Sequence, residues 1–402
     1  MEIIKPYSTN YKYSKGRLYQ ETESNSRTPY MRDRDRLIHS AAFRRLEHKT
    51  QVFVHHEGDN FRSRLTHTIE VTQIARTIAR HLGLDQDLAE TIALAHDLGH
   101  TPFGHAGEES LNDAMKLYGG FDHNAQTLRI VTKLERKYAQ FDGLNLTWES
   151  LEGIVKHNGP LKKNIPTAIT EYQNYVKKID KRQDLKLKLF PGPEAQVAGI
   201  ADDIAYCNHD LDDGIRAGLF TIDEISHIEH IKRIIDSLEL KWGDIEKRRL
   251  LHETIRNLIS DMIKDVIDES SSVINKGMFQ NVDEIRSLDF PVISFSKKAS
   301  KNNEVLRKFL LKKMYRHTIV NRMTTKAKRI VNDLFTAFAV DFSILPIEWR
   351  ERVEVENRNQ KYRVISDYIA GMTDRYAIME HKRIFDLHGG WSGTSLYEKR
   401  DR

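Results

Sequence analysis

The sequence has a single cysteine, Cys207, in 402 residues, so no disulfide can form within the chain. Disulfide-stabilised folds are therefore excluded, and we expect a reducing compartment, the cytoplasm. Long apolar runs are also missing: the mean hydropathy is -0.57, and no stretch approaches the ~20 apolar residues of a membrane span. Residues 1–6 show neither a signal-peptide nor a transit-peptide pattern, so we expect no export, no organelle import and no membrane partner.

Proline is scarce, with nine residues, whereas 30% of all residues are charged. This composition favours helices over a β-sandwich, which needs many turns rich in Gly and Pro. The spacing of apolar residues predicts helices over 66–82, 85–95, 107–118 and 194–213, and longer amphipathic stretches over 222–240, 245–268, 304–340 and 360–388. The best candidate for a strand is residues 291–295. We therefore predict an all-α fold.

Histidines are concentrated in one region, because ten of the 18 lie between residues 39 and 123. His67 falls in the first turn of one predicted helix, and His96 and Asp97 lie at the end of the next. Imidazoles together with carboxylates suit a divalent ion of Mn, Mg, Fe, Co, Ni or Zn, and the ligand types do not choose among these metals. A His-Asp pair alone is more typical of a protein surface. The clustering of histidines favours a site here.

The order His67, His96-Asp97, Asp202 resembles the H…HD…D signature of the HD-domain phosphohydrolases. Longer motifs are similar to those of the dGTP triphosphohydrolase family and extend from about residue 27 to about residue 376. They are RDRLIHS (34–40), FRRL (43–46), KTQVF (49–53), RSRLTHT (62–68), HDLGHTPFGH (96–105), FDHNAQ (121–126), ADDIAYCNHDLDDG (201–214) and DYIAGMTDRY (367–376). So many motifs in the same order are a far more specific signal than the His-Asp pair.

This resemblance implies an all-α HD-domain fold and a metal-dependent hydrolase. The enzyme would convert a deoxynucleoside triphosphate, with dGTP favoured, into deoxynucleoside and inorganic triphosphate by attack at the α-phosphorus. We expect an N-terminal extension (1–26), an HD core (27–220) and an additional helical C-terminal part (221–402), packed together as one continuous domain. Members of the family commonly form rings or stacked dimers, so we also expect a homo-oligomer.

The resemblance also implies which residues bind one divalent metal ion per active site. They are His67, His96, Asp97 and Asp202. Asp203 is an adjacent alternative to Asp202. We prefer Asp202 because Tyr206 and Asp210 follow it at i+4 and i+8, on one stripe of the predicted helix 194–213.

Catalysis is assigned to His105 with Glu108, which lie three residues apart and are neighbours if the third helix has begun there. His105 is the candidate for proton transfer to the departing 5′-oxygen, and Glu108 would orient it. A structural alternative is that His105 caps the following helix.

The resemblance assigns substrate contacts to Gln51, Arg64, His100, His123, Tyr206 and Asp210. The arginine that matches Arg64 holds a phosphate oxygen in the family, and the residues that match Tyr206 and Asp210 hold the deoxyribose. A carboxylate is a suitable acceptor for the 3′-hydroxyl. Gln51 and His123 could instead support neighbouring residues without touching the substrate. His55-His56 is interpreted as a solvated pair in a loop.

Residues 305–329 contain nine Lys or Arg and no acidic residue. This stretch is compatible with a regulatory nucleotide or single-stranded DNA as a further partner. The alternative is an amphipathic helix whose charges meet water or a neighbouring subunit. Two other functions stay open: an HD phosphohydrolase acting on nucleoside monophosphates or cyclic dinucleotides, and a non-catalytic protein that binds nucleotides or single-stranded DNA.

Overall fold

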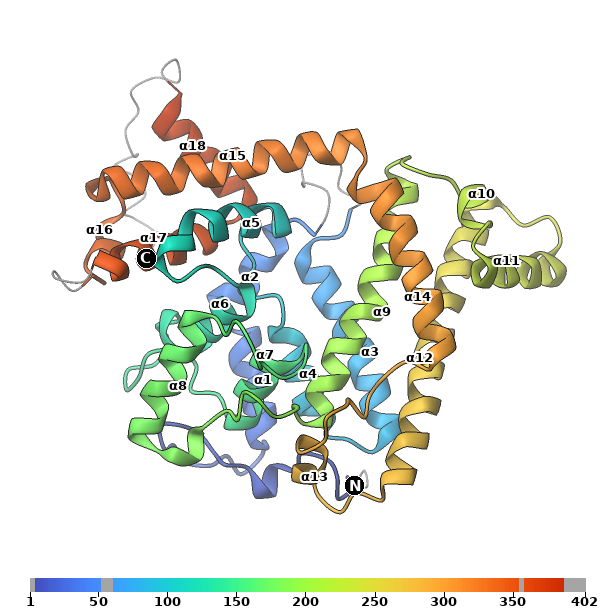
Figure 1. Cartoon of the computed structure of the whole chain (residues 1–402), viewed down its shortest axis with the longest axis horizontal. Coiled ribbons are helices and arrows are strands. Elements are labelled where there is room, and N and C mark those ends of the chain that lie inside the picture. Colours follow the sequence, from blue (N-terminus) through green and yellow to red (C-terminus); the bar gives the residue numbers. More distant parts are fainter. Residues whose placement is uncertain (1–3, 52–60, 354–357, 387–402) are drawn as a thin grey trace.

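The computed structural model describes residues 4–51, 61–353 and 358–386. The regular secondary structure of these residues is helical, and β-pairing among them is limited to three isolated bridges (Figure 1). The predicted all-α fold is therefore confirmed. None of the helices in this part of the chain combines the length and the apolar character needed to cross a membrane.

The described residues up to 216 form nine α-helices. They are α1 (Pro29–Ile38), α2 (Ala41–Arg45), α3 (Arg64–Leu82), α4 (Gln86–Ala95), α5 (Gly104–Met115), α6 (His123–Arg129), α7 (Trp148–Lys156), α8 (Thr167–Ile179) and α9 (Pro193–Arg216). Short 3-10 or π turns lie between them: η1 (Tyr11–Tyr13), η2 (Leu46–His48), η4 (Lys116–Tyr118), η5 (Ile130–Leu134) and η6 (Lys181–Gln183).

The second half is also helical. It contains α10 (Ile222–Ile225), α11 (Glu229–Trp242), α12 (Lys247–Gly277), α13 (Val282–Arg286), α14 (Lys297–Leu310), η7 (Leu311–Tyr315), α15 (Thr318–Val340), η8 (Phe342–Ile344), α16 (Ile347–Arg350), α17 (Arg358–Ala370) and α18 (Asp374–Phe385). The amphipathic stretches predicted over 222–240, 304–340 and 360–388 each contain more than one helix, and residues 387–388 lie outside the described residues.

The ends of α3 and α4 follow from residues that the sequence places there. The Ser63 side chain accepts a hydrogen bond from the Thr66 amide at the start of α3, and Gly83 ends the helix in the left-handed region at φ 68°. The Asp85 side chain caps α4 by accepting from the Leu88 amide at 3.0 Å. The helices predicted over 66–82 and 85–95 are thus confirmed, and they fix where the histidines at their ends lie.

Residues 291–295 do not form a strand, so that prediction is wrong. Val292 and Ile293 are buried, and both of their amides donate to the Gln196 side-chain oxygen on α9, at 2.8 and 3.1 Å. A side chain therefore satisfies the backbone groups that a neighbouring strand would otherwise pair. The apolar pattern of this segment reflects its burial against α9 and α12.

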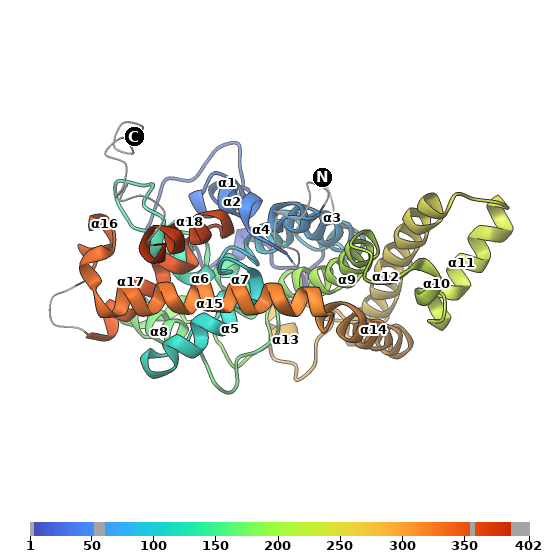
Figure 2. The same ribbon diagram turned by 90° about the horizontal axis from the view of Figure 1, so that it is seen from above.

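Helices α3, α4 and α9 pack against one another and form the centre of the molecule, with α12 along one side (Figure 1). Helix α15 lies across α5, and α17 and α18 pack beside it in a second apolar cluster. Helices α10 and α11, with the adjacent end of α12, project from the rest of the chain in the second view (Figure 2). The four predicted metal ligands lie on α3 and α9 or directly after α4.

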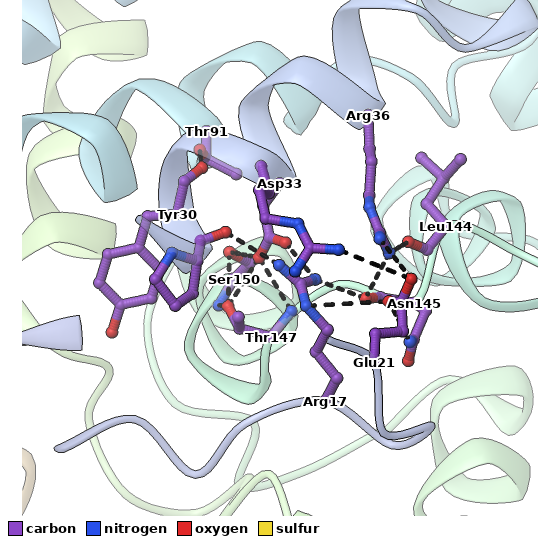
Figure 3. Close-up of polar contacts among 12 residues, drawn as sticks. Arg17, Glu21, Tyr30, Asp33, Arg36, Thr91, Leu144, Asn145, Thr147 and Ser150 are labelled. Carbon is purple, nitrogen blue, oxygen red and sulfur yellow. Dashed lines mark hydrogen bonds and ion pairs between the residues drawn. The ribbon is translucent and has the colours of Figure 1, made fainter. Parts of the chain in front are cut away.

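The N-terminal segment is fastened to the core by a buried polar cluster around Asp33 (Figure 3). The Arg17 guanidinium donates to Asp33, and the second Asp33 oxygen accepts from the Thr147 amide at 2.8 Å and from the Thr147 and Ser150 hydroxyls at 2.7 Å each. Arg36 pairs with Glu21 at 2.7 Å. Both oxygens of the buried Asp33 carboxylate are therefore engaged.

Candidate active site

Four predicted metal ligands meet where α3, α4 and α9 converge. His67 lies in the first turn of α3, His96 and Asp97 directly follow α4, and Asp202 lies on α9. His67 Nε2 is 2.9 Å from Asp202 Oδ1, and His96 Nε2 is 3.6 Å from the same oxygen and 3.5 Å from Asp97 Oδ1. The ligand atoms of His67, His96 and Asp97 all lie within 4.8 Å of one another. The structure thus brings together side chains that are up to 135 residues apart.

The protonation of this cluster suits a divalent cation. His96 Nδ1 is 2.6 Å from the Ala93 carbonyl, to which it donates, so the lone pair of this ring lies on Nε2. That atom is buried and has no hydrogen-bond partner in the described part of the chain. Burial would raise the pKa of Asp202, but His96 and His67 lower it to about 2. Two imidazoles and two carboxylates, with one nitrogen left unpartnered, form a donor set that a divalent metal fits.

His67 contacts His209, and His209 in turn contacts Glu70. Neither His209 nor Glu70 was predicted from the sequence. His67 Nδ1 is 3.2 Å from His209 Nδ1, His209 Nε2 is 3.1 Å from Glu70 Oε2, and Arg62 donates to that oxygen at 3.0 Å. Burial, together with His67 and Arg62, lowers the pKa of His209 to about 2, so this ring is neutral. If His209 donates to Glu70 and accepts from His67, every nitrogen has a partner and His67 Nε2 keeps its lone pair for a metal.

Arg64 and His100 lie on the other side of Asp97. The guanidinium of Arg64 is 2.9 Å from Asp97 Oδ2, and His100 Nδ1 is 3.2 Å from Asp97 Oδ1. Burial lowers the pKa of His100 well below its usual value, and Arg64 and His123 add to this effect. His100 therefore stays neutral, and its ring centre is 4.1 Å from that of His123.

Glu108 links the two remaining histidines. One of its oxygens accepts from the His123 amide at 3.0 Å and is 2.8 Å from His123 Nδ1, and the other is 3.5 Å from His105 Nδ1. Burial would raise the pKa of Glu108, but the hydrogen bonds from both histidines lower it. Helix α5 begins at Gly104, three residues earlier than predicted, so His105 lies in its first turn and Glu108 follows one turn later on the same side. The His105 side chain is 67% exposed.

Tyr206 and Asp210 lie farther along α9, where they meet a residue from another helix. The Tyr315 hydroxyl of η7 donates to Asp210, and the Tyr206 and Tyr315 rings stack with centres 6.2 Å apart. Burial raises the pKa of Asp210 to about 7. Asp203 does not point into this cluster, because it pairs with Arg307 at 2.7 Å. Tyr315 is 105 residues from Asp210, so only the fold shows that they meet.

Gln51 is buried, and its side-chain oxygen has no partner among the residues that the structure describes. It directly follows Thr50, whose amide donates to Asp374 at 2.9 Å. The pair His55-His56 lies outside the described residues. Gln51 thus follows a residue that Asp374 holds in place, and its buried side-chain oxygen can accept a hydrogen bond.

The turn between His100 and α5 is tied to the C-terminal helices. Phe103 has a positive φ of 63°, a region that non-glycine residues rarely adopt. Its amide donates to Asp374 at 2.8 Å. The fully buried ammonium group of Lys49 donates to the carbonyls of His100, at 2.5 Å, and Ala370, at 2.8 Å. These bonds fix the path of the turn that carries His100 and His105.

The basic stretch 305–329 spans the end of α14, η7 and the start of α15. Five of its nine cations pair with carboxylates: Arg307 with Asp203, Lys308 with Glu304, Lys313 with Glu224, Lys328 with Glu109 and Arg329 with Asp333. These pairs reduce the free positive charge of the stretch. Binding of single-stranded DNA by these residues stays a prediction.

Comparison with known proteins places these residues within established families. Residues 64–185 match the HD domain, and residues 293–383 match the phosphohydrolase-associated domain. A deoxyguanosinetriphosphate triphosphohydrolase-like protein of Parvibaculum lavamentivorans is 51% identical over 389 residues, which cover 95% of this chain and 96% of the relative. Proteins of the same name from Brucella anthropi and Caulobacter sp. are each 49% identical, with 95% of this chain and 95% and 96% of the relatives covered.

One solved structure, a hypothetical protein from Aquifex aeolicus, aligns with 88% of this chain and 71% of its own. The TM-score is 0.33 and the sequence identity is 17%, so the alignment does not assign a fold or a function.

Proposed function

Because the chain belongs to the deoxyguanosinetriphosphate triphosphohydrolase-like family of HD-domain phosphohydrolases, we propose that it hydrolyses a deoxynucleoside triphosphate, preferably dGTP. The products would be deoxynucleoside and inorganic triphosphate. The observation that supports this proposal most directly is the meeting of His67, His96, Asp97 and Asp202 around an unpartnered imidazole nitrogen, with Tyr206 and Asp210 along the same helix.

These four residues would hold one divalent cation. Such a cation, when bound, neutralises phosphate charge and lowers the pKa of a coordinated water. The donor set is compatible with Mn, Mg, Fe, Co, Ni or Zn. His209 and Glu70 would keep the lone pair of His67 directed at the cation, and the Ala93 carbonyl does the same for His96.

Arg64 and His100 would contact the phosphates. Arg64 lies beside Asp97 with its guanidinium buried, so a non-bridging phosphate oxygen next to the metal position would be within its reach. His100 is neutral and borders the same space together with His123. The neutral His100 ring would donate a hydrogen bond to a phosphate oxygen without adding a positive charge to the site.

His105 would give a proton to the 5′-oxygen as it leaves. Glu108 lies 3.5 Å from His105 Nδ1 and stays ionised, so it can orient the ring and stabilise its protonated form. Replacing His105 by alanine should lower turnover about 100-fold, as is typical for the loss of one general acid, with metal content unchanged. Unchanged turnover would contradict this role, and His81→Ala on the exposed side of α3 is the control.

The sugar would lie between α9 and η7. Asp210 can accept a hydrogen bond from the 3′-hydroxyl, and Tyr206 offers a ring face for the deoxyribose. Tyr315 already donates to Asp210 and so holds this carboxylate in place. Gln51, with a free side-chain oxygen, would approach the sugar and the base edge from the other side.

The reaction is tested by supplying dGTP with Mn or Mg and separating the products. Deoxyguanosine together with inorganic triphosphate is the expected result. Release of pyrophosphate or single phosphate would assign a different HD phosphohydrolase activity. Purified protein that holds metal and DNA but turns over no nucleotide would be a binding protein instead. A panel of the four dNTPs decides the base preference.

The quaternary structure and location are also proposals. We expect a homo-oligomer in the cytoplasm, and light scattering of the purified protein tests the first of these. We also propose a regulatory nucleotide or single-stranded DNA as a partner of residues 305–329. Its binding affinity should fall steeply as the salt concentration rises.

A further inference from the structure

A second cavity lies apart from the four metal-site residues, between the HD core and the C-terminal helices. It has a volume of about 550 Å³, within the usual range of small-molecule sites. Its walls come from α2, α6 and η5 on one side and from α16, α17 and α18 on the other. None of the four predicted metal ligands lines it.

The cavity contains buried polar atoms without partners. In the described part of the chain, Arg45 Nε, Arg352 Nε and Gln126 Oε1 are buried and make no hydrogen bond, and Gln126 is only 2% exposed. Neither Arg45 nor Arg352 forms an ion pair with any of the described residues. Burial lowers the pKa of both guanidiniums. A buried Nε–H group without an acceptor is costly, and a bound anion that accepted from both Nε atoms would remove that cost.

The carboxylates that line the same cavity are already engaged. Glu135 accepts from the amides of Ala41, at 3.3 Å, and Ala42, at 2.8 Å. Asp367 accepts two hydrogen bonds from Arg129. Glu135 and Asp367 stabilise the charges of Arg45 and Arg352. Their oxygens do not accept from the Nε groups of these arginines, which leaves two buried donors for an anionic ligand.

Aromatic side chains form a wall beside these cations. The Arg352 guanidinium lies 4.1 Å from the centre of the Trp349 ring, and the Trp349 and Tyr368 rings are 5.4 Å apart. The Tyr368 and Tyr376 hydroxyls are 3.2 Å from each other. Guanidiniums together with ring faces and hydroxyls recognise phosphate groups and can accommodate a planar ring.

The cavity also shares a wall with the proposed active site. Gly371, Met372 and Thr373 line the cavity, and they lie between Ala370, which accepts from Lys49, and Asp374, which accepts from Thr50 and Phe103. A ligand against this segment would therefore press on residues that hold the His100–Phe103 turn.

From these observations we propose that the cavity is a second ligand site, that it takes a small phosphate-bearing anion, and that its occupancy alters the turn carrying His100 and His105. The binding part of this proposal does not depend on the proposed hydrolysis. A change in the turn can be detected whether or not the protein hydrolyses dGTP. Only the interpretation of that change as regulation of catalysis rests on the proposed function.

Binding is tested by calorimetric titration of the metal-free full chain with sodium tripolyphosphate and, separately, with GMP. Arg352→Gln and Arg45→Gln should each weaken binding at least tenfold, since each removes a charge-assisted contact. Arg64→Gln, at the proposed active site, is the matched control and should leave this binding event in place. Tighter binding of GMP would assign a role to the aromatic wall, and equal or tighter binding of tripolyphosphate would assign the site to phosphate groups alone.

Binding that is lost in Arg64→Gln but kept in Arg352→Gln and Arg45→Gln would overturn the second site. Arg352 is partly exposed, so this variant decides the question if Arg45→Gln does not fold. The effect on the turn is read by hydrogen exchange of residues 100–104. Ligand should change the exchange of the Phe103 amide in the wild type and not in Arg352→Gln, and no change in the wild type would overturn the coupling while leaving dGTP hydrolysis to its own assay.

Discussion

The buried polar clusters around Asp33 and around His96 differ in whether their polar atoms all have hydrogen-bond partners. Around Asp33, both carboxylate oxygens accept hydrogen bonds from Arg17, Thr147 and Ser150 (Figure 3). Around His96, an imidazole nitrogen that is equally inaccessible has no partner, although two carboxylates lie 3.5 and 3.6 Å away. The first cluster is complete as folded, whereas the second needs something more.

The difference is informative because burying a polar group without a partner costs stability. A cluster that exists only to hold the fold should satisfy its own groups, as the Asp33 cluster does at the joint between the N-terminal segment and the core. A cluster that is retained with an open acceptor is organised for a ligand. Replacing one member of each cluster tests whether that cluster stabilises the fold or binds a ligand.

The largest effect is expected for His96→Gln. Loss of this ligand should reduce metal content and lower kcat/KM for dGTP about 1,000-fold, because a bound cation contributes several kcal/mol to transition-state stabilisation. The metal-free variant should lose less unfolding free energy than Asp33→Ala does. Atomic absorption, steady-state kinetics and urea unfolding measure the three quantities. A variant that keeps its metal and its turnover would show that His96 is not a ligand.

Asp33→Ala should have the opposite profile. Removing this carboxylate leaves the Arg17 charge and three donors without their acceptor, so the free energy of unfolding should fall by about 3 kcal/mol. Turnover of the protein that remains folded should change little. Asp35→Ala on the same helix is the control, because its ion pairs with Arg27 and Arg34 are partly exposed and should contribute less than about 1 kcal/mol.

His209 is a hydrogen-bond partner of His67, and His67 belongs to the cluster around His96 that has an unpartnered nitrogen. His209→Leu should weaken metal affinity about 10- to 100-fold by releasing the orientation of His67. His209→Gln should restore part of the affinity, because its side-chain oxygen can still accept from His67. Calorimetric metal titration gives both values. Equal loss in the two variants would make His209 a packing residue, and His227→Gln on the surface is the control.

The smallest effect is expected for Lys49→Met and appears as a pH dependence. Burial lowers the pKa of Lys49 from its ordinary 10.5 to about 7. Between these two values the unfolded chain binds more protons than the folded chain, so this lysine makes the wild type more stable as pH rises. The wild type should therefore gain up to about 1.4 kcal/mol per pH unit over the variant above pH 7. Urea unfolding at pH 7 and pH 9 measures this, and a pH-independent difference would contradict it.

Much of the fold could be predicted because local signals fix it. Capping residues and apolar spacing located α3 and α4 almost to the residue, and the order of the motifs identified the family. The strand prediction for residues 291–295 failed because an apolar segment of this kind is typical of a buried loop as well as of a strand. Their amides bond to Gln196, nearly 100 residues away, and no local pattern announces that.

The candidate site divides in the same way. His67, His96, Asp97 and Asp202 are found from their motifs. Tyr315 lies in no quoted motif, and Asp374 lies in the motif 367–376, but their contacts cross more than 100 residues and are not visible in the sequence. His209 had a usable signal. It lies seven residues after Asp202, two turns along α9, so it must lie on the same side of the helix as that carboxylate.

The bonds from Asp374 to Thr50 and Phe103 have a consequence for how the protein is made. They join residues that are 324 and 271 positions apart. During synthesis, the metal-site helices emerge long before residue 374, so a nascent chain holds all four metal ligands while the turn with His100 and His105 still lacks its anchor. Hydrolytic competence should therefore be acquired late on the ribosome, and a chain cut before residue 374 should bind metal better than it turns over substrate.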